Sequence, residues 1–215
     1  AATLNYMSLD RVDLGFAVKE ICRSMANPTE EGWQKLKKIG RYLVGAGNVA
    51  MTFQWGMVKE RVDGYTDSDF AGSDRRTSTS GGVVMVGGVV VKSWSKQQKV
   101  VALSSGEAEL YGAVKLGCEL MGMKSLISDF GLSVELIMYL DAKATIGMLS
   151  RRGAGNMKHV ETNNFWLQNT IANKIVSLRK VRSEDNIADI LTKYLTGDTI
   201  SHLLRIMRIN RMRVS

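Results

Sequence analysis

The sequence has few cysteines and no long apolar run. Its two cysteines, Cys22 and Cys118, lie in helix-like segments without CxxC or Cys/His spacing. This argues against a disulfide framework and a zinc site, and we expect both residues to be core thiols. The longest apolar stretch, residues 81–91, is broken by glycines and is far shorter than the ~20 residues of a membrane span. With no evident signal peptide either, we expect an intracellular chain without a transmembrane helix.

Positive charge is in excess. The 215-residue chain has a formal net charge of +8 and a sequence pI near 9.5. Because Lys and Arg neutralise phosphates, nucleic acid is the leading partner class. The 45% hydrophobic content is enough for a buried core, and the length allows one ordinary domain plus an appendage. Composition alone favours a blander alternative, a basic soluble protein with scattered surface acids.

Four acidic residues stand at the edges of expected regular elements. They are Asp67 in the strand-like YTDSDFAGS, Glu109 in the helix opening SSGEAELYGA, Asp141 at the end of the apolar strand in IMYLDAKAT, and Asp189 in the helix opening SEDNIADILTK. Such placements let acids that are distant in the sequence converge. Their repulsion must then be offset, and Mg²⁺ or Mn²⁺ is the natural counter-charge because hard cations take oxygen ligands. The pattern therefore predicts a two-metal nuclease site.

The first sixty residues are expected to form a helical appendage. Apolar residues recur at helical spacing from Leu14 to Met25, and Asn27-Pro28-Thr29 followed by two glutamates predicts a turn and a capped helix start. This second helix carries Trp33, Leu36, Ile39 and Leu43 on one face and ends at Gly45-Ala46-Gly47. Its basic residues, for which a solvated face and nucleic-acid contact both stay open, are Lys35, Lys37, Lys38 and Arg41. The chain opens at AATLNYMS without an initiator Met, so we expect it to be a fragment of a longer protein.

From residue 50 onward the pattern changes from helical periodicity to strand character. An edge strand is expected at 51–55, followed by a β-meander over 62–70, 81–86, 89–95 and 100–103. Helices are expected at 105–129, 142–150, 159–172 and 186–194, with strands at 136–141 and 175–181. Residues after Thr196 are expected to form a basic amphipathic helix. The order predicts an α/β, ribonuclease H-like fold with a mixed central sheet flanked by helices and an N-terminal helical appendage.

Five segments carry a resemblance to a known family. They are YTDSDFAGSDRRTSTSGG, KSWSKQQKVVALSSGEAELYGA, LDAKATIGM, KHVETNNFWLQ and VRSEDNIADILTKYL. Together they resemble the ribonuclease H domain of copia-type LTR retrotransposon (pseudoviral) polyproteins. The end of that family's reverse transcriptase, with its connection to ribonuclease H, is similar to the upstream VKEICRSMANPTEEGWQKLKKIGRYLVG. The resemblance implies a hydrolase that cuts the RNA strand of RNA–DNA hybrids during reverse transcription.

The resemblance assigns the family's acidic tetrad to Asp67, Glu109, Asp141 and Asp189. Both Glu107 and Glu109 are candidates in SSGEAEL, but about 200° separates them on a helix, so they cannot both face one point. Family members place the acid three residues before a small helix residue, as Glu109 precedes Gly112. Glu107 is then a capping or solvent-facing acid. Asp69 shares a strand face with Asp67 and is a candidate neighbour of the metal ligands.

By the same resemblance, the tetrad would hold two Mg²⁺ ions, with Mn²⁺ as a substitute. Many ribonucleases H also have a mobile His just before the last acid. Here residues 182–186 read RSEDN, so that His is absent and the proton shuttle is unassigned. His159 is the tempting substitute, but a helix-start or surface histidine with a structural hydrogen bond is the simpler interpretation.

Substrate contacts are predicted for Ser104, Ser105, Arg75 and Lys96. The two serines precede the helix of Glu109, where hydroxyls and helix-start amides could bind sugar or phosphate oxygens, although an N-cap explains them as well. The basic residues belong to a possible phosphate track, for which solvated charge is nearly as good an explanation: Arg75, Arg76, Lys92, Lys96 and Lys99. Trp94 could stack on a nucleotide, but packing under the sheet is more common.

Two rival functions share the fold class. A non-catalytic module that binds hybrid as a connection domain would have lost the acids, whereas all four are present. An integrase or transposase needs its third acid on a later helix and lacks an early helical Glu. We therefore expect the end of a reverse transcriptase and its connection at 1–60, a ribonuclease H domain at 61–196 and a basic C-terminal helix at 197–215. The expected partners are an RNA–DNA hybrid and the reverse transcriptase region of the same polyprotein, in the cytoplasm (in a virus-like particle) or in the nucleus.

Overall fold

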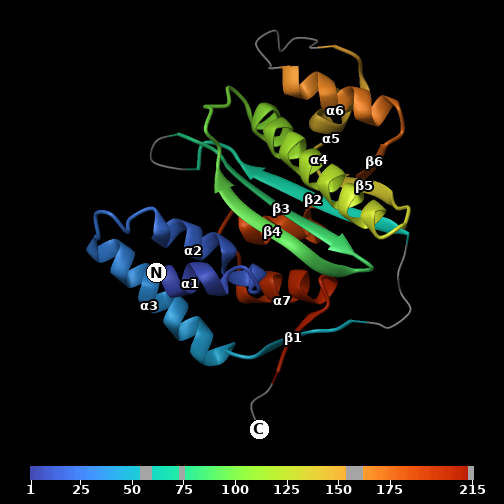
Figure 1. The fold of residues 1–215 in the computed structure, drawn as a ribbon. Helices are drawn as coiled ribbons and strands as arrows, with labels where there is room; N and C mark the ends of the chain where they lie inside the picture. Colours follow the sequence, from blue (N-terminus) through green and yellow to red (C-terminus); the bar gives the residue numbers. More distant parts are fainter. Residues whose placement is uncertain (54–59, 73–75, 154–161, 213–215) are drawn as a thin grey trace.

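The computed structural model describes residues 1–53, 60–72, 76–153 and 162–212, and a five-stranded sheet lies at its centre (Figure 1). The strands are β2 (Arg61–Asp69), β3 (Thr79–Val86), β4 (Val89–Gln97), β5 (Glu135–Leu140) and β6 (Val176–Lys180). Their order across the sheet is β4-β3-β2-β5-β6. The pairs β2/β3 and β3/β4 are antiparallel, whereas β5 runs parallel to β2 and β6. The predicted mixed sheet of a ribonuclease H-like α/β fold is confirmed.

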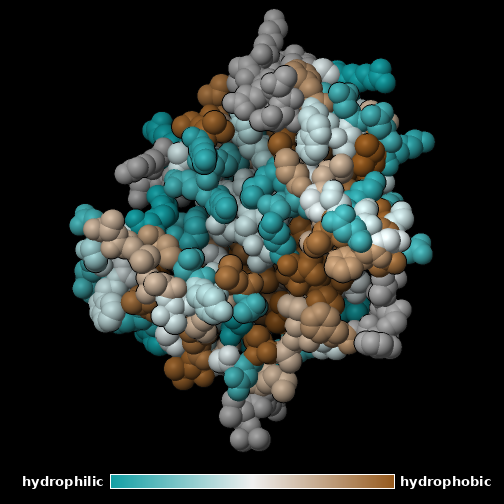
Figure 2. All heavy atoms as spheres, in the orientation of Figure 1, coloured by the Kyte–Doolittle hydropathy of each residue, from teal (hydrophilic) through white to brown (hydrophobic). Residues whose placement is uncertain are grey.

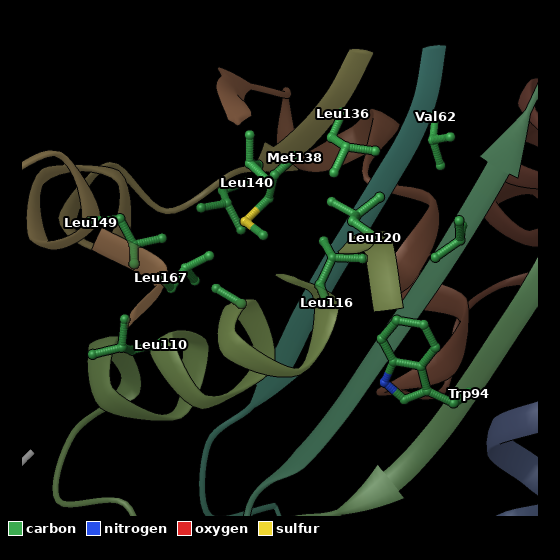
Figure 3. Close-up of a cluster of buried hydrophobic side chains, with 13 residues drawn as sticks. Val62, Trp94, Leu110, Leu116, Leu120, Leu136, Met138, Leu140, Leu149 and Leu167 are labelled. Atoms are coloured by element: carbon green, nitrogen blue, oxygen red, sulfur yellow. The ribbon is translucent and has the colours of Figure 1, made fainter. Parts of the chain in front are cut away.

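Helices α4 (Ser105–Asp129), α5 (Lys143–Ser150) and α6 (Thr162–Ala172) lie on one side of this sheet. The long helix α4 crosses β2 and buries Leu116 and Leu120 against Val62 and Leu136 (Figure 3). Trp94 of β4 joins the same cluster and is only 7% exposed. Trp94 is therefore a core residue packed against the sheet, which was the simpler of the two interpretations, and it does not offer a surface on which a nucleotide could stack.

The opposite face of the sheet is covered by η3 (Ile187–Leu191) and α7 (Gly197–Ile206), and the short η2 (Ser183–Asp185) precedes η3 in the chain and contacts α7. Successive residues of a strand point to opposite faces. Val84 accordingly joins the α4 cluster, while Val83 packs with Leu191 and Leu203 on the η3 side. Apolar burial on both faces fixes the register of the central strands, because a one-residue slip would exchange the two sets of side chains.

The N-terminal segment forms α1 (Ala2–Met7), η1 (Val12–Leu14), α2 (Gly15–Cys22) and α3 (Glu30–Gly45). The predicted cap is present, since the Thr29 hydroxyl accepts a hydrogen bond of 3.1 Å from the backbone N–H of Gly32. A small cluster containing Val18, Ile21 and Ile39 joins α2 to α3. Trp33 was expected on this apolar face, but it is 53% exposed and lies under the ammonium group of Lys37 instead.

A second, two-stranded sheet joins residues from the two ends of the chain. It pairs β1 (Val49–Met51) antiparallel with β7 (Ile209–Arg211). Beside it the Arg11 guanidinium donates to Asp13 at 2.9 and 2.7 Å and to the carbonyl oxygens of Gly47 and Ala46. The buried Arg11 thus ties the segment before α2 to the end of α3, which leads into β1.

Several local predictions were wrong. The predicted edge strand at 51–55 is not part of the main sheet, because its described residues either belong to β1 or lie outside any strand. Residues 100–103 form a connection and not a strand, and the helix predicted at 186–194 is the short 3₁₀ segment η3. The last helix ends at Ile206 and is followed by β7. Cys118 is exposed and Cys22 is half-buried, so neither is a core thiol.

Polar and apolar side chains separate on the face of the molecule seen in Figure 2. Apolar side chains gather between β4 and β1, where a groove of about 420 Å³ is lined by residues that include Val49, Met51, Phe53, Val90 and Val91. Across the described ranges, no helix has both the length and the apolar character that crossing a membrane would require.

Candidate active site

Asp67 lies on the central strand β2, at the end of the sheet where β2 and β5 finish. In the β2/β3 register it is opposite Gly81, and η3 lies directly above that glycine. A Cβ atom on Gly81 would come within 2.7 Å of the Leu191 side chain and 2.8 Å of Thr192. The absence of a side chain therefore lets η3 approach the strand closely. As a result the Thr192 hydroxyl donates a hydrogen bond to Oδ2 of Asp67. Asp67 is only 5% exposed.

Glu109 reaches the same place from the second turn of α4. Its Oε1 accepts a hydrogen bond of 3.1 Å from the backbone N–H of Ser68, the residue after Asp67. Gly112, one turn further on, permits this approach, because a Cβ there would lie 2.8 Å from the Ser68 hydroxyl and 2.9 Å from that of Thr66. The expected position of Glu109 before a small helix residue thus has a packing reason.

Glu107 faces away from this position and caps the helix. The Ser104 hydroxyl accepts from the backbone N–H of Glu107, and the Glu107 carboxylate accepts from the N–H of Leu103 at 2.8 Å and from the Tyr111 hydroxyl. This reciprocal arrangement is a variant of the capping box. Glu107 is 2% exposed, so the capping interpretation holds and the solvent-facing one is wrong.

Asp141 completes a group of three carboxylates. It follows β5, the strand parallel to β2, and its Oδ2 accepts a hydrogen bond of 3.1 Å from the Ser183 hydroxyl. One carboxylate oxygen each from Asp67, Glu109 and Asp141 lies within 4.8 Å of the other two. Oxygens at this separation could bind one cation together. Carboxylate oxygens are the ligands that Mg²⁺ and Mn²⁺ prefer.

Asp189 comes to the cluster from η3. Asn186 positions that segment, because its side-chain amide donates to the Thr66 carbonyl oxygen at 3.1 Å while its Oδ1 accepts from the N–H of Ala188. The Lys193 ammonium group lies 2.8 Å from Asp189 Oδ2 and 3.7 Å from Asp67 Oδ2. Asp189 Oδ1 is buried, with no hydrogen-bond partner among the described residues.

Burial and neighbouring negative charge raise the pKa of Glu109 and of Asp189. Burial, together with the charges of Asp67 and Asp141, raises the pKa of Glu109 to about 8, although the Ser68 N–H opposes the rise. Burial and the charge of Asp67 likewise raise the pKa of Asp189 to about 7, against the opposing effect of Lys193. For Lys193 burial would lower the pKa, but the neighbouring carboxylates outweigh it and raise the pKa. A cluster in which Glu109 and Asp189 resist ionisation in this way fits a divalent cation, whose charge would offset the repulsion.

Other predicted site residues have varied positions. Ser104 is the N-cap of α4, Ser105 begins the helix, and Lys96 is an exposed residue of β4. Their contacts with a substrate stay a prediction. Asp69 is half-buried, and burial and Asp67 raise its pKa. Arg75 and His159 lie outside the described residues.

Four neighbours of the acids were not singled out from the sequence: Ser183, Asn186, Thr192 and Lys193. A signal existed for Lys193, because Asp189 and Lys193 have the spacing of a helical ion pair. Nothing local links Thr192 or Ser183 to their partners, since Asp67 and Asp141 are distant in the sequence and meet them only through the packing of η3 and η2.

Known proteins resemble this chain along most of its length. No protein-family model matches the chain. The chain is 33% identical over 191 residues to the retrovirus-related Pol polyprotein from transposon TNT 1-94 of Nicotiana tabacum, which covers 87% of this chain and 14% of that protein. It is 31% identical over 198 residues to the corresponding polyprotein from transposon RE2 of Arabidopsis thaliana, covering 90% of this chain and 14% of that protein.

Among solved structures, LC11-RNase H1 isolated from compost aligns with a TM-score of 0.45 and 17% identity, over 68% of this chain and 99% of that one. The chain spans 14% of the length of the two Pol polyproteins. The chain belongs to the copia-type retrovirus-related Pol polyproteins, of which it forms a segment with a ribonuclease H-like fold.

Proposed function

We propose that the chain is a metal-dependent endonuclease that hydrolyses the RNA strand of RNA–DNA hybrids during reverse transcription of a retrotransposon. The observation that carries the proposal is the acid cluster: three carboxylates with oxygens within 4.8 Å of one another, and a fourth linked to them through Lys193. The net charge of +8 supports a polyanionic substrate, because Lys and Arg elsewhere on the surface would neutralise its phosphates.

In this proposal Asp67, Glu109, Asp141 and Asp189 hold two Mg²⁺ ions, for which Mn²⁺ could substitute. The bound ions would activate a water molecule and stabilise the charge that develops on the leaving oxygen. The chain's own residues keep the ligands in place: Thr192 holds Asp67, the Ser68 N–H holds Glu109 and Ser183 holds Asp141. Such preorganisation means that little rearrangement would be needed when substrate binds.

Substrate contacts in this proposal involve the start of α4 and the basic edge of the sheet. Ser105 and the exposed Lys96 lie outside the acid cluster and have side chains that suit phosphate or sugar oxygens. We assign hydrolysis to residues 61–196, and propose the reverse transcriptase region of the same polyprotein as a partner. The site of action would be intracellular, in the cytoplasm or the nucleus.

A non-catalytic, hybrid-binding module is the alternative, and the cluster disfavours it. Gathering buried carboxylates costs stability unless a cation offsets their repulsion. A module that only bound a polyanion would be better served by neutral residues at these positions. No observation specifically favours this second function.

Cleavage of end-labelled RNA–DNA hybrid, single-stranded RNA and duplex DNA, with and without Mg²⁺, tests the proposal. We expect cleavage of the RNA strand of the hybrid only, because a ribonuclease H site reads a 2′-OH on one strand and the deoxyribose geometry of the other. EDTA should abolish cleavage. Comparable rates on single-stranded RNA would indicate a different nuclease.

Substitutions test the residue assignments. Asp67→Asn and Asp141→Asn each keep the side-chain shape but remove a ligand charge, so we expect cleavage to fall well over tenfold while circular dichroism and Tm show that the fold survives. Glu109→Gln should be as severe. Glu107→Gln on the same helix is the matched control and should be mild, because the amide oxygen can still accept from the Leu103 N–H while the amide NH₂ can donate to the Tyr111 hydroxyl. Activity within tenfold of wild type in either Asp variant at saturating Mg²⁺, or the reverse order of the two Glu variants, would contradict the assignments.

A further inference from the structure

Lys193 is a cation placed among the acids that are proposed to bind metal. Its ammonium group contacts Asp189 Oδ2 at 2.8 Å and lies 3.7 Å from Asp67 Oδ2. The two partners come from different elements, since Asp189 is in η3 and Asp67 is on β2. An ordinary ion pair along one helix would engage Asp189 alone, and in water such a pair contributes little to stability.

The surroundings of Lys193 differ from those of a surface lysine. The side chains of Asp67 and Asp189 are 8% and 13% exposed, whereas that of Lys193 is 45% exposed. The acids are therefore fixed in a place with little water, and the lysine reaches them from the solvent side. Its flexible four-carbon stem can leave that position without any backbone movement.

Some carboxylate oxygens of Asp67 and Asp189 contact Lys193, and one has no hydrogen-bond partner among the described residues. Asp67 Oδ2 accepts from the neutral Thr192 hydroxyl and also faces Lys193. Asp189 Oδ2 is taken by Lys193, while its Oδ1 is buried without a partner in the described part of the chain. A divalent cation bound by these two acids would share their oxygens with the ammonium group and would repel it.

We propose that Lys193 is a built-in counter-cation of the acid cluster, which binds Asp189 and Asp67 when no metal is present and leaves them when a divalent cation binds. Lys193 thereby stabilises the metal-free chain and weakens metal affinity. The inference rests on the proposed metal-dependent function, but it concerns binding and stability and not the rate of cleavage.

Mn²⁺ binding to the whole 215-residue chain, measured through the electron paramagnetic resonance signal of free Mn²⁺, tests this competition. Three variants are compared with wild type: Lys193→Gln removes the charge, Lys193→Arg keeps it, and Lys174→Gln is the matched control. Lys174 is exposed and precedes β6, whose far end pairs Lys180 with Leu140 beside Asp141. The control thus removes an identical charge at the opposite end of the sheet.

We expect Lys193→Gln to bind Mn²⁺ about threefold to tenfold more tightly, a range that allows for the solvent screening of a half-exposed cation. The metal-free Tm of this variant should fall, because the acids lose their counter-charge. Its Tm should then rise further on Mn²⁺ addition than that of wild type, since a ligand stabilises in proportion to RT ln(1 + [L]/Kd). Lys193→Arg and Lys174→Gln should both resemble wild type.

Unchanged or weaker Mn²⁺ affinity in Lys193→Gln would overturn the inference, as would an equal gain in Lys174→Gln, which would indicate a general charge effect. Absence of Mn²⁺ binding in every variant would overturn both the inference and the metal dependence of the proposed function. The expected order of affinities without any hybrid cleavage would leave the role of Lys193 intact and would contradict only the proposed nuclease.

Discussion

Glu109 and Asp189 are carboxylates held in a fold that favours their protonated forms. Burial and the charge of Asp67 raise both pKa values, to about 8 and about 7. In the unfolded chain these groups would titrate near their ordinary values of 4.5 and 3.8. Between those limits the native chain binds more protons than the unfolded chain, so its free energy of unfolding decreases as the pH rises.

We therefore predict that the metal-free chain loses stability as the pH increases from about 4.5 toward about 8. Thermal unfolding in EDTA across this range should show the fall in Tm, and saturating Mg²⁺ should reduce it. Glu109→Gln should flatten the profile, because an uncharged amide replaces the group with the largest rise. Glu31→Gln, which removes the exposed carboxylate of the ion pair with Lys35, is the control and should keep the profile. A metal-free Tm that increases through this range in wild type would contradict the prediction.

Single residues differ in how far the sequence could predict them. The four acids were predictable because each lies in or beside an expected regular element, and the structure places three of them together. Their roles as metal ligands and catalysts stay predictions. Thr192 and Ser183 were missed because a hydroxyl has no distinctive pattern until the fold gives it a partner. Cys118 was misjudged because it lies on a face of α4 that the sheet does not cover.

At the scale of elements, the packing of α4 on β2 sets the position of Glu109. Gly112 faces the hydroxyls of Thr66 and Ser68 so closely that a Cβ would lie 2.8–2.9 Å from them. Gly122, ten residues along the same helix, has nothing within 4 Å of such a Cβ. A side chain would therefore be crowded at Gly112 and would have free space at Gly122, although both lie on the same helix.

We predict that Gly112→Ala lowers the free energy of unfolding by about 1–3 kcal/mol, because the added methyl group overpacks a site with little room. It should also lower cleavage by moving Glu109 away from Asp67. Gly122→Ala should instead stabilise by up to about 1 kcal/mol through helix propensity and leave cleavage unchanged. Urea unfolding and the hybrid assay measure both effects. Equal stability changes in the two variants would show that α4 does not depend on close approach at Gly112.

Elements with strong local signals were predicted well. The bounds of α4 were predicted as 105–129, which the structure confirms, because Ser104 and Glu107 form a capping pair before a long helical run. The error at 100–103 arose because an apolar run is not enough for a strand without a neighbour: Val101 and Leu103 are exposed in the connection to α4. For η3, the close contact with Gly81 and the hydrogen bonds of Asn186 compete with regular helix formation.

At the scale of the whole molecule, the two ends of the chain are joined in a way that no local pattern signals. β1 pairs with β7 across most of the sequence, and Arg211 of β7 donates to the Tyr42 hydroxyl, which in turn donates to Asp13. The sequence predicted a helical appendage, but not that it shares hydrogen bonds and a small sheet with the C-terminal strand. Long-range pairing of short strands is set by tertiary packing, since three residues carry too little periodicity to be recognised.

The charge of the molecule bears on how it would hold a polyanion. Four basic residues of α3 are candidates for a platform that binds hybrid apart from the acid cluster: Lys35, Lys37, Lys38 and Arg41. Two of them are partly engaged, since Lys35 pairs with Glu31 at 2.7 Å and Lys37 lies over the ring of Trp33. Both partners are exposed on the helix, so either lysine could exchange its partner for a phosphate.

We predict that replacing all four with Gln weakens hybrid binding and flattens its salt dependence, because fewer counterions would be released. If each residue contacts one phosphate, the slope of log affinity against log salt should decrease in magnitude by about 3–4. The cleavage rate at saturating hybrid should barely change, since none of the four residues is a proposed metal ligand and the platform would act on affinity. A double variant of Lys124→Gln and Lys174→Gln, compared with a double variant of Lys37→Gln and Lys38→Gln, controls for net charge because each removes two charges. An unchanged slope would mean that these four residues form only a solvated helix face, and the binding charge would then be assigned to Arg75, Lys96 and Lys99.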